Sequence, residues 1–286
     1  MPSLLTLQDY SKDWIEEILY TADIMKSSKD HKKQPWQNCL VNKNILLYFE
    51  KPSLRTHLTF EIAVKNLGGN PIYYNNSQSL GRESDKDMIK NISRWGIEGI
   101  VARVYKQETL ETFAKEGNMP VINALSDMYH PCQALADYMT IKEITKKDWK
   151  DIKVAYIGEP NNVSNSLMIC GSKLGVTFTV VTPVESDLDN YTKNIDDVKD
   201  YDVIYTDTWL SMGDTTPIEE KIALYKDYQV NQELLDKSNI SYVLHCLPAH
   251  RGQEITDEVI DSHEEIYQQA ENRLWTEIAI LFKLFE

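Results

Sequence analysis

The sequence has little that would tie it to nucleic acid or to a membrane. Of its 286 residues only 30 are Lys or Arg, against 44 Asp or Glu, which gives a net charge of −14. Such a surface repels phosphate backbones and anionic lipids unless it carries a basic patch, and none is visible in the sequence. An apolar run such as Ile278 to Phe282 is far too short to span a bilayer, and the opening MPSLLTLQDY lacks the layout of a signal peptide. We therefore expect a cytoplasmic protein without nucleic-acid or membrane partners.

Cysteine is scarce, and two nucleotide-binding motifs are missing. The four cysteines, Cys39, Cys132, Cys170 and Cys246, form no CxxC pair and have no zinc-like spacing. We expect reduced thiols rather than a disulfide framework or a structural metal. The segment 158–162 follows a predicted strand but lacks the GxGxxG glycines, which argues against NAD. There is also no GxxxxGK[ST] sequence, so an ATPase-type phosphate loop is unsupported.

What is present is ordinary globular composition in an alternating α/β pattern. Hydrophobic residues make up 42% of the chain, and its length suits about two domains. The first half has a predicted helix in its first forty residues, predicted strands at 44–49, 99–104 and 120–124, and a helix beginning near Pro131. Another helix face contains Phe60, Ala63, Val64 and Leu67 and is ended by glycines 68 and 69.

The second half repeats this organisation after a segment rich in lysine and acidic residues, 143–151. We expect strands at 153–157, 177–181, 202–205 and 241–244, with a helix that ends at Gly175. The last segment has apolar residues near helical spacing and is predicted to be a long amphipathic helix. The expected fold is α/β: two doubly wound parallel-sheet domains, 1–143 and 144–263, joined by interdomain helices. A C-terminal helix, about 264–286, packs back on the first domain.

Polar residues gather where a predicted strand turns into a predicted helix. The turn at 50–56 places the hydroxyls of Ser53 and Thr56 and the guanidinium of Arg55 at a helix N-terminus, which is suited to an anion. A plain N-cap with an exposed arginine explains the same residues equally well. His130 and Gln133 have the same layout beside Pro131, and a capping histidine is the alternative there.

Two more strand ends in the second half carry reactive side chains. Asp207 follows one strand, where an aspartate is usually turn chemistry, and His245 with Cys246 follows another. A Cys/His pair suggests a thiol hydrolase. Adjacent residues of a strand point to opposite faces, however, so we expect His245 to be badly placed to activate Cys246.

Taken together and in order, these motifs resemble the aspartate/ornithine carbamoyltransferase family, and its ornithine branch in particular. The resemblance runs the length of the chain and is carried by the segments FEKPSLRTHLTFE, HPCQALADYMTI, TDTWLSMG, HCLPAHRGQEITDEV and QAENRLWTEIA. It implies transfer of a carbamoyl group from carbamoyl phosphate to the side-chain amine of L-ornithine, giving citrulline and phosphate within arginine metabolism. Our mechanistic hypothesis is direct attack through a tetrahedral intermediate, with neither metal nor cofactor.

The resemblance assigns carbamoyl phosphate to the first domain. The phosphate positions match Ser53, Arg55, Thr56 and the backbone of Leu54, while Arg103 bridges phosphate and carbonyl oxygen. His130, Gln133 and Arg273 match residues that contact the carbamoyl group. Such donors would form an oxyanion-type site.

Ornithine is assigned to the second domain. Asn162, Asp207, Ser211 and Met212 match positions that bind the amino-acid end, and Cys246 and Leu247 match those that line the approach of the amine. The expected catalytic set is Arg103, His130, Asp207, Cys246 and Arg273.

The family is built as a homotrimer in which a loop from the neighbouring subunit completes the carbamoyl phosphate site. Here that loop is 75–84, with Ser79 or, by another gap placement, Gln78 at the crossing position; we favour Ser79. Two residues depart from the family pattern: His57 stands where an arginine usually follows the SxRT turn, and Trp275 stands where histidine is common. Loss of the arginine is expected to weaken binding of carbamoyl phosphate.

Other functions remain open at this point. Aspartate is disfavoured as the second substrate because that branch uses basic residues for a dicarboxylate, whereas putrescine or an acylated ornithine is harder to exclude. A non-catalytic scaffold that kept the fold, or a hydrolase using Cys246, are the alternatives outside this reaction.

Overall fold

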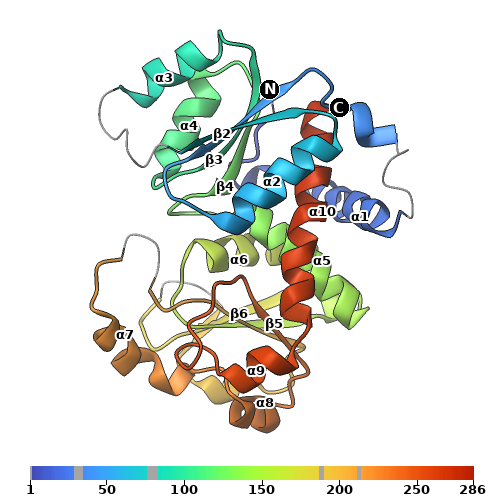
Figure 1. The fold of residues 1–286 in the computed structure, drawn as a ribbon. Helices are drawn as coiled ribbons and strands as arrows, with labels where there is room; N and C mark the ends of the chain where they lie inside the picture. Colours follow the sequence, from blue (N-terminus) through green and yellow to red (C-terminus); the bar gives the residue numbers. More distant parts are fainter. Residues whose placement is uncertain (1, 29–34, 76–82, 187–189, 211–213) are drawn as a thin grey trace. The chain divides into compact units, whose positions relative to one another are not determined.

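The structure is a computed structural model that describes residues 2–28, 35–75, 83–186, 190–210 and 214–286. It divides into two compact units, one of residues Met1–Leu135 with Arg273–Glu286 and one of residues Ala136–Asn272. Each unit is built around one parallel β-sheet (Figure 1). The expected α/β fold with two parallel-sheet domains is confirmed.

The first unit has a four-stranded sheet in the order β2-β1-β3-β4. Its elements are η1 (Leu7–Asp9), α1 (Lys12–Ser27), η2 (Pro35–Asn38), β1 (Asn44–Phe49), α2 (Leu54–Asn66), β2 (Asn70–Asn75), α3 (Asp85–Ile92), β3 (Ile97–Arg103), α4 (Gln107–Glu116), β4 (Val121–Leu125), the start of α5 (Pro131–Thr145) and the end of α10 (Glu265–Phe285).

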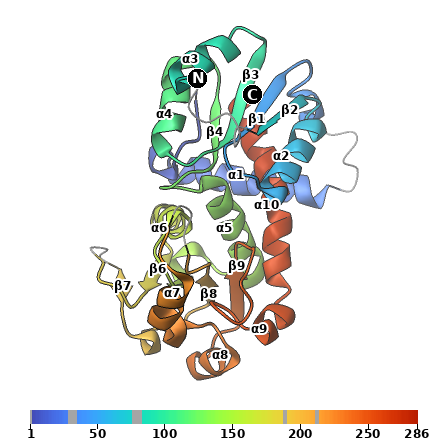
Figure 2. The same cartoon turned by 60° about the vertical axis from the view of Figure 1, so that its left-hand side comes forward.

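Helices cover both faces of this sheet. Figure 2 shows α3 and α4 together on one face, where Ile89 and Phe113 pack with Tyr48 and Ile100 in one core cluster. The end of α10 lies against the sheet at Gly99, where an added Cβ would be 2.4 Å from Cζ of Phe285. The predicted packing of the C-terminal helix on the first unit is therefore confirmed.

The sequence analysis did not predict one strand of this unit. β2, with the sequence NPIYYN, pairs in parallel with β1 at the sheet edge, and its side chains are almost all exposed. An edge strand tolerates Pro71 because one side of its backbone needs no partner. Without buried side chains or apolar alternation, nothing in the segment marks it as a strand.

The second unit has a five-stranded sheet in the order β7-β6-β5-β8-β9, again parallel throughout. Its elements are the rest of α5, η3 (Trp149–Asp151), β5 (Lys153–Ile157), α6 (Asn162–Leu174), β6 (Thr177–Val181), β7 (Tyr191–Thr192), η4 (Ile195–Val198), β8 (Val203–Thr206), α7 (Ile218–Tyr225), η5 (Lys226–Tyr228), α8 (Gln232–Ser238), β9 (Tyr242–His245), α9 (Asp257–Ser262) and the first part of α10.

Both sheets place their loops in the same way. In parallel sheets, ligand-binding loops lie at the carboxyl ends of the strands. The turns after β1, β4, β5, β8 and β9 carry most of the residues singled out in the sequence. In the part of the chain that the structure describes, no helix has the length and apolar character needed to cross a membrane.

Candidate active site

The predicted anion site in the first unit forms the start of α2. Ser53 is the residue before the helix, yet its side chain makes no capping hydrogen bond and instead donates to Oγ1 of Thr56 at 3.2 Å. Leu54 and Arg55 are exposed in the first turn, whereas Thr56 is buried. Helix N-termini present backbone N–H groups and a partial positive charge, so this turn suits an anion.

Arg273, on α10, joins the start of α2 to the start of α5. Its Nη1 donates to Oε1 of Gln133 at 2.7 Å, and its Nη2 reaches Oγ1 of Thr56 at 3.4 Å. Its Nε and Nη2 both donate to Oε1 of Glu277, at 3.0 and 2.6 Å. Three residues expected from the sequence to bind one substrate are thus brought into a single network.

His130 lies beside this network in an uncharged form. The residue is buried, and burial lowers its pKa well below the ordinary value, with the positive charges of Arg273 and Arg103 acting in the same direction. A neutral imidazole can donate one hydrogen bond without adding charge. Arg103 ends β3, in register with Phe49 at the end of β1. The predicted site residues of the first unit therefore supply three guanidinium groups, an imidazole, an amide and a helix N-terminus.

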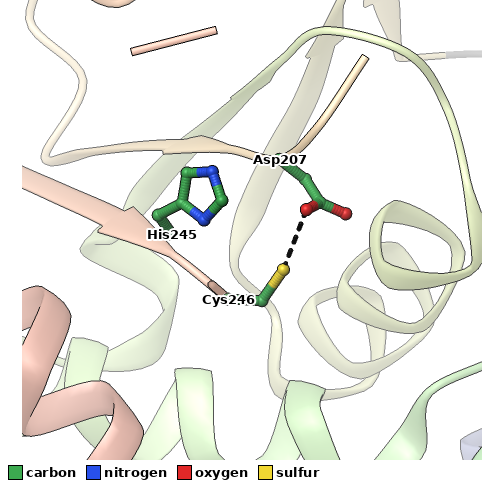
Figure 3. Close-up of side chains that lie close together, drawn as sticks. All are labelled: Asp207, His245 and Cys246. Carbon is green, nitrogen blue, oxygen red and sulfur yellow. Dashed lines mark hydrogen bonds between the residues drawn. The ribbon is translucent and has the colours of Figure 1, made fainter. Parts of the chain in front are cut away.

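The second unit gathers a different set of side chains around Asp207, which is buried at the end of β8. The thiol of Cys246, after β9, donates to its Oδ1 at 3.0 Å (Figure 3). Asn161, at the start of α6, donates through Nδ2 to its Oδ2 at 2.8 Å. Asn162 is the first residue of α6 and is itself buried. The loops after three neighbouring strands thus meet at one carboxylate.

Cys246 is held as a neutral thiol. Burial raises its pKa well above the ordinary value, and the nearby Asp207 carboxylate raises it further. Since the thiolate is the nucleophilic form, this environment makes the sulfur a poor nucleophile.

His245 is not placed to activate Cys246, as expected from the sequence, but strand alternation is not the reason. β9 ends at His245, so Cys246 is not a strand residue, and a ring nitrogen, Sγ and an Asp207 oxygen all lie within 4.8 Å of one another. The ring is nevertheless occupied elsewhere: the N–H of Leu247 donates to Nδ1 at 2.8 Å, and Nε2 lies 3.2 Å from Oε1 of Glu254. With Nδ1 accepting, Nε2 must be the protonated donor. His245 therefore has no lone pair directed at the thiol or at a metal ion.

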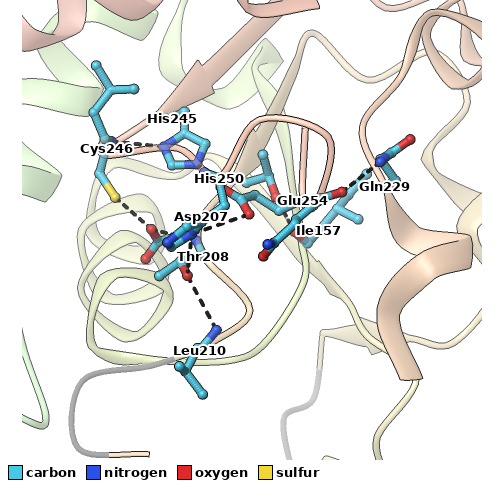
Figure 4. A network of polar contacts seen from close by, with 12 residues as sticks. Ile157, Asp207, Thr208, Leu210, Gln229, His245, Cys246, His250 and Glu254 are labelled. Atoms are coloured by element: carbon cyan, nitrogen blue, oxygen red, sulfur yellow. Dashed lines mark hydrogen bonds and ion pairs between the residues drawn. The ribbon is translucent and has the colours of Figure 1, made fainter. Parts of the chain in front are cut away.

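A further polar network shapes the loop after β9. Figure 4 shows the polar network extending from Asp207 through Thr208 and His250 to Glu254. Oγ1 of Thr208 lies 3.2 Å from Nδ1 of His250, and the backbone N–H of His250 donates to the buried Glu254 carboxylate. Leu247 is half-buried and adopts a φ of 54°.

Some predicted site residues lie outside the described part of the chain, namely Gln78, Ser79, Ser211 and Met212. Two residues that the sequence analysis did not single out belong to the networks. Asn161 shows a capping pattern with Ser164, but its contact with Asp207 spans 46 residues. Glu277 has no sequence signal, because an acidic residue within a long helix usually faces solvent.

Comparison with known proteins places both units in one family. The model "Aspartate/ornithine carbamoyltransferase, carbamoyl-P binding domain" matches residues 3–143, and "Aspartate/ornithine carbamoyltransferase, Asp/Orn binding domain" matches residues 150–284. The ornithine carbamoyltransferase of Moritella abyssi is 44% identical over the full length of both chains. That of Pyrococcus furiosus, named anabolic, is 42% identical and is matched over 97% of this chain and 94% of its own.

Solved structures of ornithine carbamoyltransferases show the same full-length similarity. The structure of the ornithine carbamoyltransferase from Pyrococcus furiosus has a TM-score of 0.89 and 41% identity, with 98% of this chain and 95% of that chain covered. The one from Thermus thermophilus also has a TM-score of 0.89, at 35% identity, and both chains are covered completely.

Proposed function

The chain belongs to the aspartate/ornithine carbamoyltransferase family, and we propose that it transfers the carbamoyl group of carbamoyl phosphate to the side-chain amine of L-ornithine, releasing L-citrulline and phosphate. The Arg273 network with Thr56 and Gln133 carries this function, because it links the anion-binding helix turn to carbamoyl-binding side chains. Full-length similarity to ornithine carbamoyltransferases supports the choice of the second substrate.

In the first unit, the start of α2 holds the phosphate. Backbone N–H groups of the first turn, including that of Leu54, and the side chains of Ser53, Arg55 and Thr56 contact its oxygens. Ser79 from a neighbouring subunit adds a further donor.

The remaining residues of the first unit bind the carbamoyl group. Arg103 and Arg273 act on the carbonyl oxygen, His130 donates to it as a neutral imidazole, and Gln133 binds the NH2. Negative charge builds on that oxygen in the tetrahedral intermediate, so fixed donors stabilise the transition state more than the ground state.

In the second unit, Asp207 accepts from the α-ammonium of ornithine. Asn162, Ser211 and Met212 bind the same end of the amino acid. Cys246 and Leu247 line the path of the side-chain amine.

The reaction proceeds by direct attack. An alkyl ammonium titrates near 10.4 in water, so only about one molecule in a thousand carries a neutral amine at neutral pH. That amine forms the N–C bond, the C–O bond to phosphate breaks, and the departing phosphate takes the proton. The neutral thiol of Cys246 argues against a carbamoyl-enzyme intermediate.

Mass spectrometry of the enzyme quenched during turnover tests this mechanism. We expect unmodified Cys246 at every time point. A carbamoylated Cys246 that forms and decays at the rate of turnover would establish a covalent route instead.

Formation of ureido products from a panel of amines tests the function itself. With carbamoyl phosphate fixed, ornithine is expected to react far faster than N-acetylornithine, putrescine, lysine or aspartate. Preference for another amine would keep the carbamoyl half of the assignment and overturn the ornithine half. Inactivity with all five would favour the scaffold reading.

We also propose a homotrimer that shares its active sites between subunits. An exposed apolar row on α2 supports this, with Leu54, Leu58 and Ile62 at 74, 45 and 44% exposure. The neighbouring edge strand β2 exposes Tyr73 and Tyr74. Exposed apolar rows of this kind commonly become subunit interfaces. The four free cysteines suit the reducing cytoplasm.

A further inference from the structure

Glu277 is a completely buried carboxylate next to the expected carbamoyl site. It lies on α10, one helical turn after Arg273, and its Oε1 accepts from both Nε and Nη2 of that arginine. Nη2 of Arg273 lies only 2.6 Å from Oε1 of Glu277, and the side chains of Glu277 and Arg273 are 0 and 7% exposed. Carboxylates are almost never fully buried unless they are paired. The question is what the pairing with Arg273 does for the site.

The contacts of Arg273 divide between two sides of its guanidinium. Glu277 occupies the Nε edge, while Nη1 donates to Gln133 and Nη2 also reaches Thr56. A planar guanidinium fixed along one edge cannot rotate without breaking both bonds on that edge. The direction in which Nη1 and Nη2 point is thus set by Glu277.

Glu277 also affects the charge of the site. Its carboxylate offsets one of the positive charges that the first unit directs toward a phosphate group. Burial raises the pKa of the Cys132 thiol on α5, and the negative charge of Glu277 raises it further. Orientation and charge compensation therefore come from one side chain.

We propose that Glu277 is a positioning residue for carbamoyl transfer, which holds the Arg273 guanidinium in its reactive orientation while weakening the attraction of the site for phosphate. This inference rests on the proposed function. Orientation acts mainly on the transition state, whereas the compensating charge acts on the binding of any phosphate. The two effects should separate when the carboxylate is changed.

Two variants probe the residue. Glu277→Gln keeps an acceptor of the same shape but removes the charge, and Glu277→Leu removes the acceptor at similar volume. Glu286→Gln, an exposed carboxylate at the end of the same segment, is the matched control for loss of one negative charge. Each full-length protein is assayed for citrulline formation, and its affinity for inorganic phosphate is measured by calorimetry.

We expect kcat to fall about tenfold in Glu277→Gln and on the order of 100-fold in Glu277→Leu, the scale typical of misplaced catalytic groups. The affinity of Glu277→Gln for phosphate should rise about two- to tenfold, since the site gains net positive charge. The control should match the wild type in both measurements.

Two results from the variants would overturn the inference. One is an unchanged kcat in Glu277→Gln. Another is a loss of kcat and of phosphate affinity in equal proportion, which would indicate a purely structural role. If Glu277→Leu does not fold, Glu277→Gln decides alone. A wild-type enzyme that forms no citrulline would refute the proposed function, and the positioning role with it, before any variant is compared.

Discussion

His57 occupies the position after the SxRT turn where the family usually has an arginine. Its ring stacks on Tyr73 with centroids 3.8 Å apart, and its Nε2 lies 3.1 Å from Oε2 of Glu61. We predict that His57→Arg lowers the KM for carbamoyl phosphate, by about two- to fivefold, because a guanidinium near the helix N-terminus is always charged. Steady-state kinetics at saturating ornithine measure this. His57→Gln controls for loss of the ring, and an unchanged or higher KM in His57→Arg would contradict the prediction.

Asn161 caps α6 and also contacts Asp207, and a single substitution can remove the second interaction without the first. Its Oδ1 caps α6 by accepting from the backbone N–H of Val163 and Ser164, while its Nδ2 donates to Asp207. Serine is an equally good N-cap but is too short to replace the second contact. We predict that Asn161→Ser leaves the free energy of unfolding within about 0.5 kcal/mol of the wild type. The KM for ornithine should rise about tenfold, because a hydrogen bond to a charged group is lost.

Asn161→Ala completes that comparison. It removes the cap as well and should cost about 1 kcal/mol of stability in urea denaturation. Equal KM values for ornithine in Asn161→Ser and the wild type would show that the contact with Asp207 is dispensable.

These residues show where reasoning from the sequence stops. Ser53, Thr56 and His130 could be located because each follows a recognisable apolar strand. The contact of Asn161 with Asp207 could not, because it joins two loops that only the finished sheet brings together. The orientation of the His245 ring was equally inaccessible, since it depends on the backbone of Leu247 and on Glu254.

At the scale of elements, α5 and α6 pack through a glycine. A Cβ at Gly171 would lie 2.3 Å from Oη and 3.2 Å from Cζ of Tyr138, whose hydroxyl donates to the backbone oxygen of Leu167. Alanine is favoured over glycine within a helix by about 1 kcal/mol. The clash should outweigh that gain, so we predict that Gly171→Ala lowers the free energy of unfolding by about 1–3 kcal/mol.

A double-mutant cycle tests the cause. In a Tyr138→Phe background the clashing oxygen is gone, so Gly171→Ala should cost clearly less there than in the wild type. Urea denaturation of the four proteins provides the values. Purely additive effects would mean that the glycine is needed for another reason.

The elements themselves differ in how readily the sequence reveals them. β1 and β4 are buried on both faces and appear as short apolar runs, which is the pattern of a parallel strand covered on both sides. β2 and β7 lie at sheet edges, with few or no buried side chains, and carry no such pattern. Hydrophobic patterning therefore recovers the strands with buried side chains, including the edge strands β4 and β9, and misses the exposed edge strands β2 and β7.

At the scale of the whole molecule, the assembly can be tested through its shared sites. If residue 79 of one subunit completes the carbamoyl phosphate site of the next, a site needs an intact Ser79 and an intact Arg55 from different chains. We therefore predict that Ser79→Ala and Arg55→Ala trimers, each nearly inactive, regain activity after they are dissociated together and reassembled. Random mixing in a closed ring gives about a quarter of the sites both intact residues.

Activity recovered in the mixture should thus approach that fraction of the wild-type value, while each variant taken through the same treatment alone stays inactive. Sedimentation of the recovered protein should give the mass of three chains. A mixture that stays inactive although trimers re-form would place the whole carbamoyl phosphate site within one chain. In that case the exposed row on α2 would join subunits without contributing to catalysis, and the loop 75–84 would have no part in the neighbouring site.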